Sequence, residues 1–194
     1  MLDKVKALRL QLPQNIFKLA YWISDREADV LFSNAKGFPL AFESGTAHGF
    51  SACVLAAAGA HNVHTFDIVN RIKVWDHADL SPLPERIYCH TSPFAWGIDV
   101  LLESFANPRE SAIFFIDGDH KRASVINEWN TIKPFLQPGD RILFHDLNMS
   151  GPRKFWGRLS GKNSEGFEFE VIETERRIGK VNITKGYDHE KVEL

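Results

Sequence analysis

Two carboxylates and an imidazole follow an apolar segment near the middle of the chain. The stretch SAIFFIDGDHKR, residues 111–122, places Asp117, Asp119 and His120 directly after that segment. Charged groups at the end of a buried strand are unfavourable unless they are paired or bind a cation. Carboxylates bind divalent cations and an imidazole titrates near neutral pH, so these residues can hold a metal ion or transfer a proton.

A second pair of such residues, His145 and Asp146, ends the apolar run RILF. Adjacent strands lie about 4.8 Å apart, so Asp117 and Asp146 can share one divalent ion if their strands are neighbours. We expect His145 or water to complete the ligand set. Oxygen ligands favour Mg²⁺, and a histidine ligand shifts the preference toward Mn²⁺, Fe²⁺ or Zn²⁺. In the alternative interpretation, helix N-termini or basic residues hold the two acids without a metal.

A loop with two glycines, ESGTAHGFS at 43–51, follows the first predicted strand of the sheet. Its glycines permit a tight turn and close approach of a ligand, with a helix N-terminus beyond. The loop lacks the G-x-G-x-x-G spacing of a dinucleotide site, and its glutamate would repel a pyrophosphate. S-adenosylmethionine carries an ammonium and a sulfonium and no phosphate, so we expect this cofactor instead. The residues expected at the cofactor are Glu43, Gly45, Thr46, Gly49 and Ser51.

Polar residues also end the next two predicted strands. Asp67 ends the second strand, where a carboxylate can accept hydrogen bonds from both hydroxyls of a ribose. Thr91 and Ser92 end the third strand and are expected on the adenine side of the cofactor. Trp96 can stack there as well, although an aromatic residue on a helix after a strand is more often part of the core.

The elements that must position these residues alternate between strand and helix patterns. Near-continuous apolar strands with intervening helices predict an α/β fold, a Rossmann-like, doubly wound, mostly parallel sheet with helices on both faces. Two closely spaced alternating segments near the end predict an antiparallel hairpin. The predicted strands are 38–44, 62–69, 86–92, 111–117, 141–147, 167–175 and 177–184. The predicted helices are 3–22, 25–35, 47–59, 94–106, 122–136 and 154–159.

Composition predicts one soluble domain. The 194 residues are 44% hydrophobic, the net charge is −2 and no run of Lys or Arg stands out. These values argue against a nucleic-acid or membrane partner, and the two cysteines do not suggest a disulfide framework. We expect a cytoplasmic protein in which 1–194 form a single domain, with an N-terminal helical segment at 1–37, a core at 38–184 and a tail at 185–194.

Three motifs together resemble the class I S-adenosylmethionine-dependent methyltransferases, and more narrowly the metal-dependent O-methyltransferases of the sugar and macrolide type. They are ESGTAHGFS, FIDGDH and PGDRILFHD. The resemblance covers residues 38–184 and implies a seven-stranded sheet. It also implies a metal-assisted attack by a hydroxyl oxygen of a small metabolite on the sulfonium methyl group.

The resemblance assigns roles to individual residues. It places Glu43, Gly45, Ser51 and Asp67 around the cofactor. It makes Asp117 and Asp146 metal ligands, with Asp117 beside the cofactor as well. It suggests Asp119 or His120 as the base that takes the acceptor's proton. His145 departs from the pattern, since relatives often have an acidic residue there, and this leaves the third ligand open.

Two other functions remain compatible with the sequence. One is a methyltransferase without metal that acts on another atom, with Asp117 and Asp146 contacting the acceptor directly. The other is a non-catalytic module that binds S-adenosylmethionine or a nucleotide. The identity of the acceptor and the oligomeric state are open, with a homo-oligomer possible.

Overall fold

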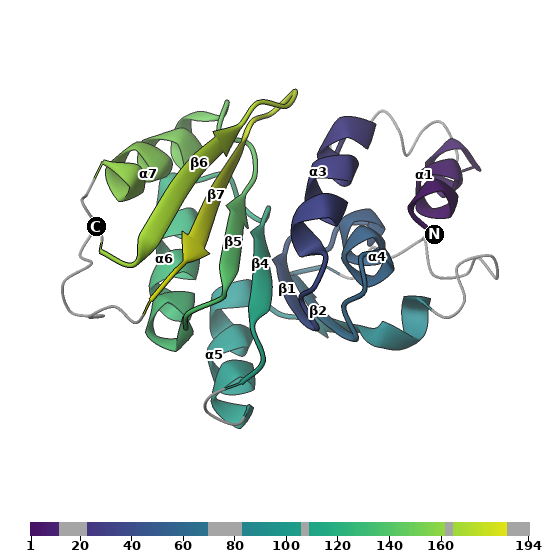
Figure 1. Cartoon of the computed structure of the whole chain (residues 1–194), viewed down its shortest axis with the longest axis horizontal. Helices are drawn as coiled ribbons and strands as arrows, with labels where there is room; N and C mark the ends of the chain where they lie inside the picture. The colour runs from purple at the N-terminus through teal and green to yellow at the C-terminus, as the bar shows by residue number, and fades with distance from the viewer. Residues whose placement is uncertain (12–22, 70–82, 106–108, 162–164, 186–194) are drawn as a thin grey trace.

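A computed structural model describes residues 1–11, 23–69, 83–105, 109–161 and 165–185 (Figure 1). Seven strands form one sheet in the order β3-β2-β1-β4-β5-β7-β6, with β1 to β5 parallel and β7 antiparallel to both β5 and β6. This arrangement confirms the predicted fold class. The strands are β1 (Leu40–Ser44), β2 (Asn62–Asp67), β3 (Ile87–Thr91), β4 (Ala112–Ile116), β5 (Arg141–Phe144), β6 (Phe167–Ile172) and β7 (Ile178–Ile183).

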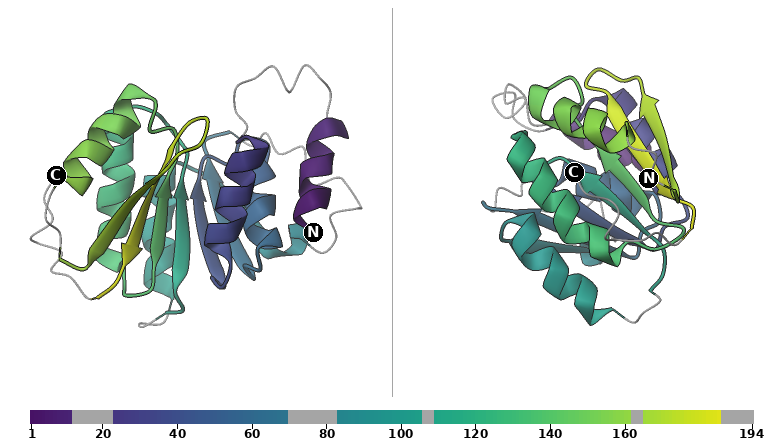
Figure 2. Two further views of the ribbon diagram at one scale, coloured as in Figure 1. Left: turned by 45° about the horizontal axis from the view of Figure 1, so that its top comes forward. Right: turned by 90° about the vertical axis from the view of Figure 1, so that its left-hand side faces the viewer.

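Helices cover both faces of the sheet (Figures 1 and 2). One face carries α1 (Leu2–Gln11), α3 (Asp25–Ala35) and α4 (Phe50–Ala57), and the other carries α5 (Phe94–Ser104), α6 (Arg122–Ile132) and α7 (Ser150–Ser160). Short 3-10 turns, η3 (Leu83–Arg86) and η4 (Lys133–Phe135), lead into β3 and follow α6.

The central strands are apolar throughout because both of their faces are buried. In β4, Ile113 and Phe115 belong to the core under α3 and α4, whereas Ala112, Phe114 and Ile116 belong to the core under α5 to α7. Side chains alternate between the two faces of a strand, so each face needs its own apolar residues.

The predicted boundaries differ from the structure mainly near the site. The strand predicted at 141–147 ends at Phe144, because Asp146 adopts a left-handed conformation with φ 57° that leaves the sheet. The helix predicted at 154–159 already begins at Ser150, since Pro152 lies in its first turn, where proline is tolerated. Part of the predicted helix 3–22 and most of the tail at 185–194 lie outside the described residues, and the single-domain assignment stays a prediction.

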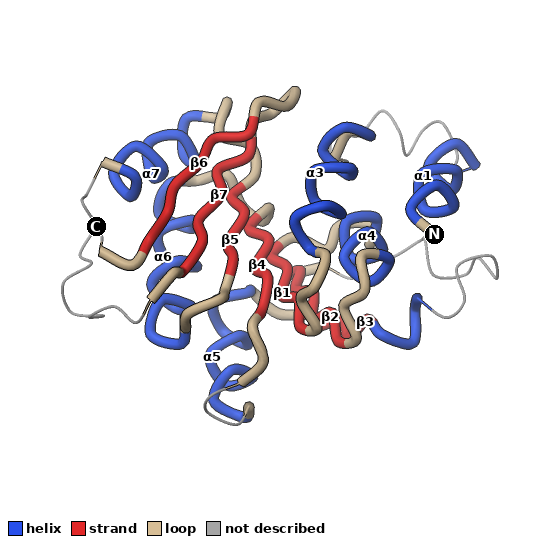
Figure 3. The backbone as a smooth tube through the Cα atoms, in the orientation of Figure 1, coloured by secondary structure: helices blue, strands red, loops and turns tan. Residues whose placement is uncertain are grey.

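The strand order reverses direction between β1 and β4. The chain proceeds from β1 to β2 and β3 on one side, and from β4 to β5 on the other. In open α/β sheets ligands bind beyond the carboxyl ends of the strands at such a switch point. Here the loops after β1 and β4 touch: a Cβ added to Gly45 would lie 2.3 Å from the carbonyl oxygen of Asp117. Figure 3 shows the strands of the sheet in red, with β1 and β4 side by side.

At the opposite ends of the strands, where β4 and β5 begin, a buried ion pair holds the chain together. Arg109 Nη2 lies 2.6 Å from Oδ2 of Asp140, and this carboxylate also accepts hydrogen bonds from the backbone N–H groups of Ala112 and Gln137. Asp140 thereby joins the starts of β4 and β5. Among the described residues, no helix is both long enough and apolar enough to cross a membrane.

We predict that Asp140→Ala lowers the free energy of unfolding by about 3–5 kcal/mol, because it leaves the Arg109 guanidinium buried without its partner. Urea denaturation measures this change. An unfolding free energy within about 1 kcal/mol of the wild type would contradict the structural role of this pair.

Candidate active site

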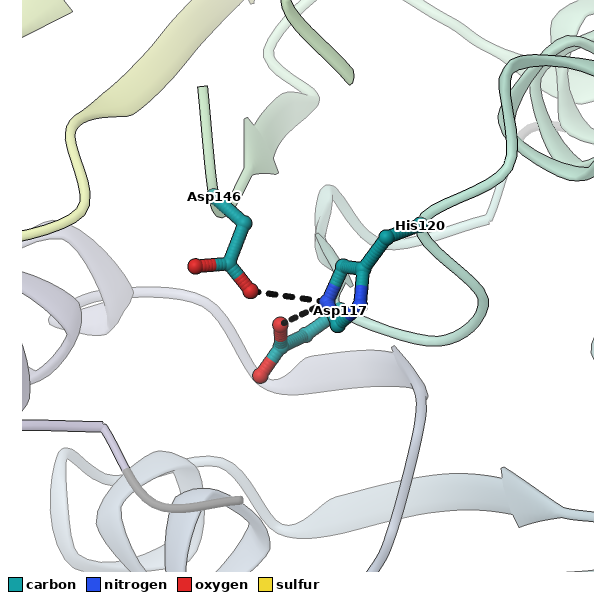
Figure 4. A group of neighbouring side chains, drawn as sticks. All are labelled: Asp117, His120 and Asp146. Atoms are coloured by element: carbon teal, nitrogen blue, oxygen red, sulfur yellow. Dashed lines mark ion pairs between the residues drawn. The ribbon is translucent and has the colours of Figure 1, made fainter. Parts of the chain in front are cut away.

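Asp117, His120 and Asp146 converge beyond the ends of β4 and β5 (Figure 4). Nε2 of His120 lies 2.7 Å from Oδ2 of Asp146 and 3.8 Å from Oδ1 of Asp117. One ligand atom from each residue lies within 4.8 Å of the other two. Two acids and an imidazole at these distances are a donor set for a divalent cation.

The orientation of His120 is consistent with a cation site. Its Nε2 is buried, yet it has no hydrogen bond of acceptable geometry among the described residues, although Asp146 is close. Contacts with Asp117 and Asp146 raise the pKa of His120 to about 9 despite the opposing effect of burial. Burial alone would raise the pKa of Asp146, but His120 and His145 outweigh it and lower that pKa far below the usual value. The ionised form of Asp146 is therefore stabilised by the two histidines beside it.

His145 lies behind this cluster. Its side chain is fully buried, with Nδ1 2.8 Å from Oδ1 of Asp117 and Nε2 3.2 Å from Oε1 of Glu27. Burial opposes its protonation, but Asp117, Asp146 and Glu27 raise its pKa well above the ordinary value. Since both ring nitrogens face carboxylates, the geometry favours His120 over His145 as the nitrogen ligand. The role of His145 as a ligand stays an untested prediction.

The loop that carries His120 is closely packed. A Cβ on Gly118 would lie 2.3 Å from Oγ of Ser44, and a Cβ on Gly151 would lie 2.0 Å from the carbonyl oxygen of His120. The end of β1 and the start of α7 therefore press on the loop from two sides. Only glycine allows both contacts.

Asp119 lines a small pocket together with Asp117, His120 and His145, but it is not one of the three clustered residues. It is exposed and accepts hydrogen bonds from the backbone N–H of Lys121 and from Oγ of Ser124, at the start of α6. Its slight burial would raise its pKa, but these contacts lower it. Its surroundings favour a role in the turn before α6, and the prediction that it is the base stays untested.

The loop after β1 forms the second half of the site. Gly45 and Gly49 have positive φ angles of 93° and 86°, and the N-terminus of α4 has no side-chain cap. Glu43 is fully buried; its Oε2 accepts a 2.5 Å hydrogen bond from Thr65, whereas Oε1 has no partner among the described residues. Burial raises the pKa of Glu43 to about 8. A cation bound beside Glu43 would stabilise the ionised carboxylate and thereby lower its pKa.

Asp67 holds the same loop in place. Its carboxylate accepts hydrogen bonds from the backbone N–H groups of Ala47 at 2.8 Å and Val69 at 3.0 Å. Thr91 is the register partner of Asp67 on β3 and is exposed. Each carboxylate oxygen has a second lone pair, so Asp67 can still accept a ribose hydroxyl.

A small pocket joins the two halves. Its lining includes four of the residues predicted at the cofactor: Gly45, Thr46, Ser51 and Asp117. Thr46 is buried and shares a 2.6 Å hydrogen bond with Thr65. The pocket lining does not include Glu43, Gly49, Asp67, Thr91 or Ser92. Ser92 is half-buried and lies between β3 and α5. The cofactor-binding roles of all these residues stay predictions.

Sequence reasoning missed two buried acids. Glu128 on α6 accepts a 2.6 Å hydrogen bond from Oγ of Ser44, and burial raises its pKa to about 7. Glu27 on α3 contacts His145. The spacing of Ser24 and Glu27 matches a capping box, which could have located the helix start, but no local pattern relates Glu27 to His145.

The raised pKa of Glu43 predicts a pH-dependent stability. Below pH 4.5 its carboxyl is protonated in both states; between pH 4.5 and about 8 it ionises only in the unfolded chain, which favours unfolding as pH rises. Glutamine does not titrate, so the variant lacks this loss. We expect the free energy of unfolding of Glu43→Gln, relative to that of the wild type, to be higher at pH 8 than at pH 5 by on the order of 1–3 kcal/mol. Denaturation at the two pH values measures this. A pH-independent difference would show that Glu43 is ionised in the folded chain.

The comparisons with known proteins agree with this fold. The model of a family described as a methyltransferase domain matches residues 42–147. No curated protein matches the chain. Cofactor-bound Rv0187 from MTB has a TM-score of 0.69 and 17% identity over 95% of this chain and 91% of that one. The O-methyltransferase TomG from Streptomyces achromogenes, in complex with SAM, has a TM-score of 0.68 and 16% identity over 94% and 89%.

A third structure, the O-methyltransferase from Bacillus cereus in complex with SAH, has a TM-score of 0.62 and 18% identity over 93% of this chain and 88% of that one. At these identities the likeness establishes the fold, while the family model covers just over half of the 194 residues. The chain belongs to the methyltransferase domain family.

Proposed function

We propose that this protein transfers the methyl group of S-adenosylmethionine to a hydroxyl oxygen of a small metabolite, with the help of a divalent metal ion. The observation that carries this proposal is the position of the cluster of Asp117, His120 and Asp146. It lies at the switch point of the sheet, where the glycine loop after β1 meets Asp117.

The cofactor half of the proposal rests on charge. The buried, half-satisfied carboxyl of Glu43 suits an ammonium group and disfavours a phosphate, and the adjoining loop offers glycines for close approach. Similar folds bind this cofactor or its product, as TomG and the Bacillus cereus enzyme do. In this arrangement Asp67 would hold the ribose while it orders the loop through the N–H of Ala47.

The metal half rests on the donor set. Asp117, His120 and Asp146 would hold the ion. A bound divalent ion would lower the pKa of the acceptor hydroxyl and fix the acceptor's position. The chain's own contribution is orientation: His145 holds Asp117, and the contact of Gly151 with the His120 carbonyl fixes the loop. With His120 as a ligand and Asp119 in the α6 turn, neither is well placed as the base, and that assignment stays a prediction.

The competing functions make different use of the same residues. In a methyltransferase without metal, the protonated imidazole of His120 would balance both acids, and the acceptor would contact them directly. A non-catalytic module would bind the cofactor but lack an acceptor. The predictions of a small-molecule acceptor, of no nucleic-acid or membrane partner, of a cytoplasmic location and of self-association remain open.

The cofactor is tested by calorimetry with S-adenosylmethionine and with NAD. We expect binding of the first and none of the second, and about tenfold or greater weakening of S-adenosylmethionine binding in Glu43→Gln, since a charge-assisted contact contributes about 1.5–3 kcal/mol. Tight binding of NAD would contradict the proposal.

The metal is tested by titrating Mn²⁺ into the wild type and Asp146→Asn. We expect Asp146→Asn to lower the Mn²⁺ affinity at least about tenfold. Replacing a residue that only supports a metal ligand already lowers metal affinity by about this factor, and Asp146 is itself a proposed ligand. Asp119→Asn, on the same loop but outside the cluster, is the matched control and should keep the wild-type affinity. Equal affinities in all three proteins would exclude Asp146 from a metal site.

A further inference from the structure

Glu27 connects three separate parts of the molecule. It lies in the first turn of α3, fully buried, and its Oε2 accepts a 2.7 Å hydrogen bond from the backbone N–H of Ser24. Its Oε1 accepts hydrogen bonds from the N–H of Arg176 at 3.0 Å and from Oγ1 of Thr174 at 3.2 Å, both in the turn between β6 and β7. The same oxygen lies 3.2 Å from Nε2 of His145.

His145 extends this connection to the cluster of Asp117, His120 and Asp146. Its side chain has no solvent exposure, and its second nitrogen, Nδ1, lies 2.8 Å from Oδ1 of Asp117. Glu27, His145 and Asp117 thus form one row that leads from α3 to the end of β4, buried at Glu27 and His145 and half-buried at Asp117. Among the described residues, Nε2 of His145 has no other acidic neighbour at ion-pair distance than Glu27.

We propose that Glu27 is a positioning residue of the active site, which acts through His145 to set the orientation of the Asp117 carboxylate. The inference rests on the proposed function, in which Asp117 is a metal ligand. Neither Glu27 nor the turn that donates to it lies in residues 42–147, the part of the chain that the methyltransferase family model matches. The flanking segments therefore complete a site whose ligands all lie within that part.

The physical reason is the cost of leaving an imidazole unpaired in the interior. Burial would raise the pKa of Glu27, but its contacts with His145 and with the backbone N–H groups of Ser24 and Arg176 lower it to about 2. The contact of Glu27 with Nε2 of His145 is an ion pair without hydrogen-bond geometry. Without this carboxylate, the buried Nε2 would lose that electrostatic partner, and the ring would gain freedom to turn. Asp117 would then lose its fixed partner. Residues behind metal ligands commonly act in this way.

A purely structural role for Glu27 is the competing explanation, since it also caps α3. Ser24 separates the two roles. Ser24→Ala removes the side-chain cap that Ser24 Oγ provides to the N–H of Glu27, at 3.1 Å, but keeps the carboxylate that faces His145. It should lower stability by about 1 kcal/mol, as the loss of an N-cap does.

The experiment measures the Mn²⁺ affinity of the wild type, Glu27→Gln and Ser24→Ala by calorimetry. The nitrogen-15 and proton shifts of the His145 ring are recorded without metal by NMR on histidine-labelled protein. We expect Glu27→Gln to lower the affinity about tenfold, at the lower end of the range for residues behind a ligand, and to shift the Nε2 resonance. Ser24→Ala should leave the affinity and the resonance unchanged.

The possible results separate this inference from the function on which it rests. An equal loss of affinity in both variants, or an unchanged affinity and resonance in Glu27→Gln, would overturn the positioning role. If the wild type bound no Mn²⁺, the metal in the proposed function would be refuted. The Nε2 resonance would then decide whether Glu27 orients His145: an unchanged resonance in Glu27→Gln would overturn the inference.

Discussion

The arrangement of the molecule around its site depends on one requirement: the carboxylate of Asp117 must be compensated by positive charge at the end of a fully buried strand. β4 is apolar along its whole length, so the first charged residue after it emerges into a crowded, poorly solvated edge. Two histidines approach Asp117 from different sides, His145 at 2.8 Å and His120 at 3.8 Å. Three features hold these histidines beside Asp117: the conformation of the 117–120 loop, the contact of α7 with that loop, and the packing of α3 against His145.

Much of the fold followed from local patterns. The alternation of strand and helix patterns located all seven strands, because doubly covered strands leave continuous apolar runs and the last two strands alternate apolar and polar residues. The sequence placed Asp117 and Asp146 near each other because both lie at the carboxyl ends of neighbouring strands, and the structure brings them together; their metal-binding role stays a prediction. The functions of His120 and His145 depend on which way each side chain turns, and Glu27 acts across more than a hundred residues of sequence. Such contacts exist only after folding, so spacing along the chain does not encode them.

The site also contains carboxyl groups held in unfavourable surroundings. Burial raises the pKa of both Glu43 and Glu128, and each has one oxygen without a hydrogen-bond partner among the described residues. These groups flank Ser44 and Gly118, the point where β1 and β4 diverge. Buried carboxyl groups with an unpaired oxygen lower the stability of the protein without a ligand. Groups of this kind are common where a ligand of complementary charge binds.

The ion pair of Arg109 and Asp140 lies at the opposite ends of the strands, where β4 and β5 begin. Stability is thus concentrated at one end of these strands and chemistry at the other. A substitution among the side chains that follow the carboxyl ends therefore leaves the contact of Asp140 with the starts of β4 and β5 in place. The residues that hold the pairing of these two strands are thus separate from the residues that form the candidate site.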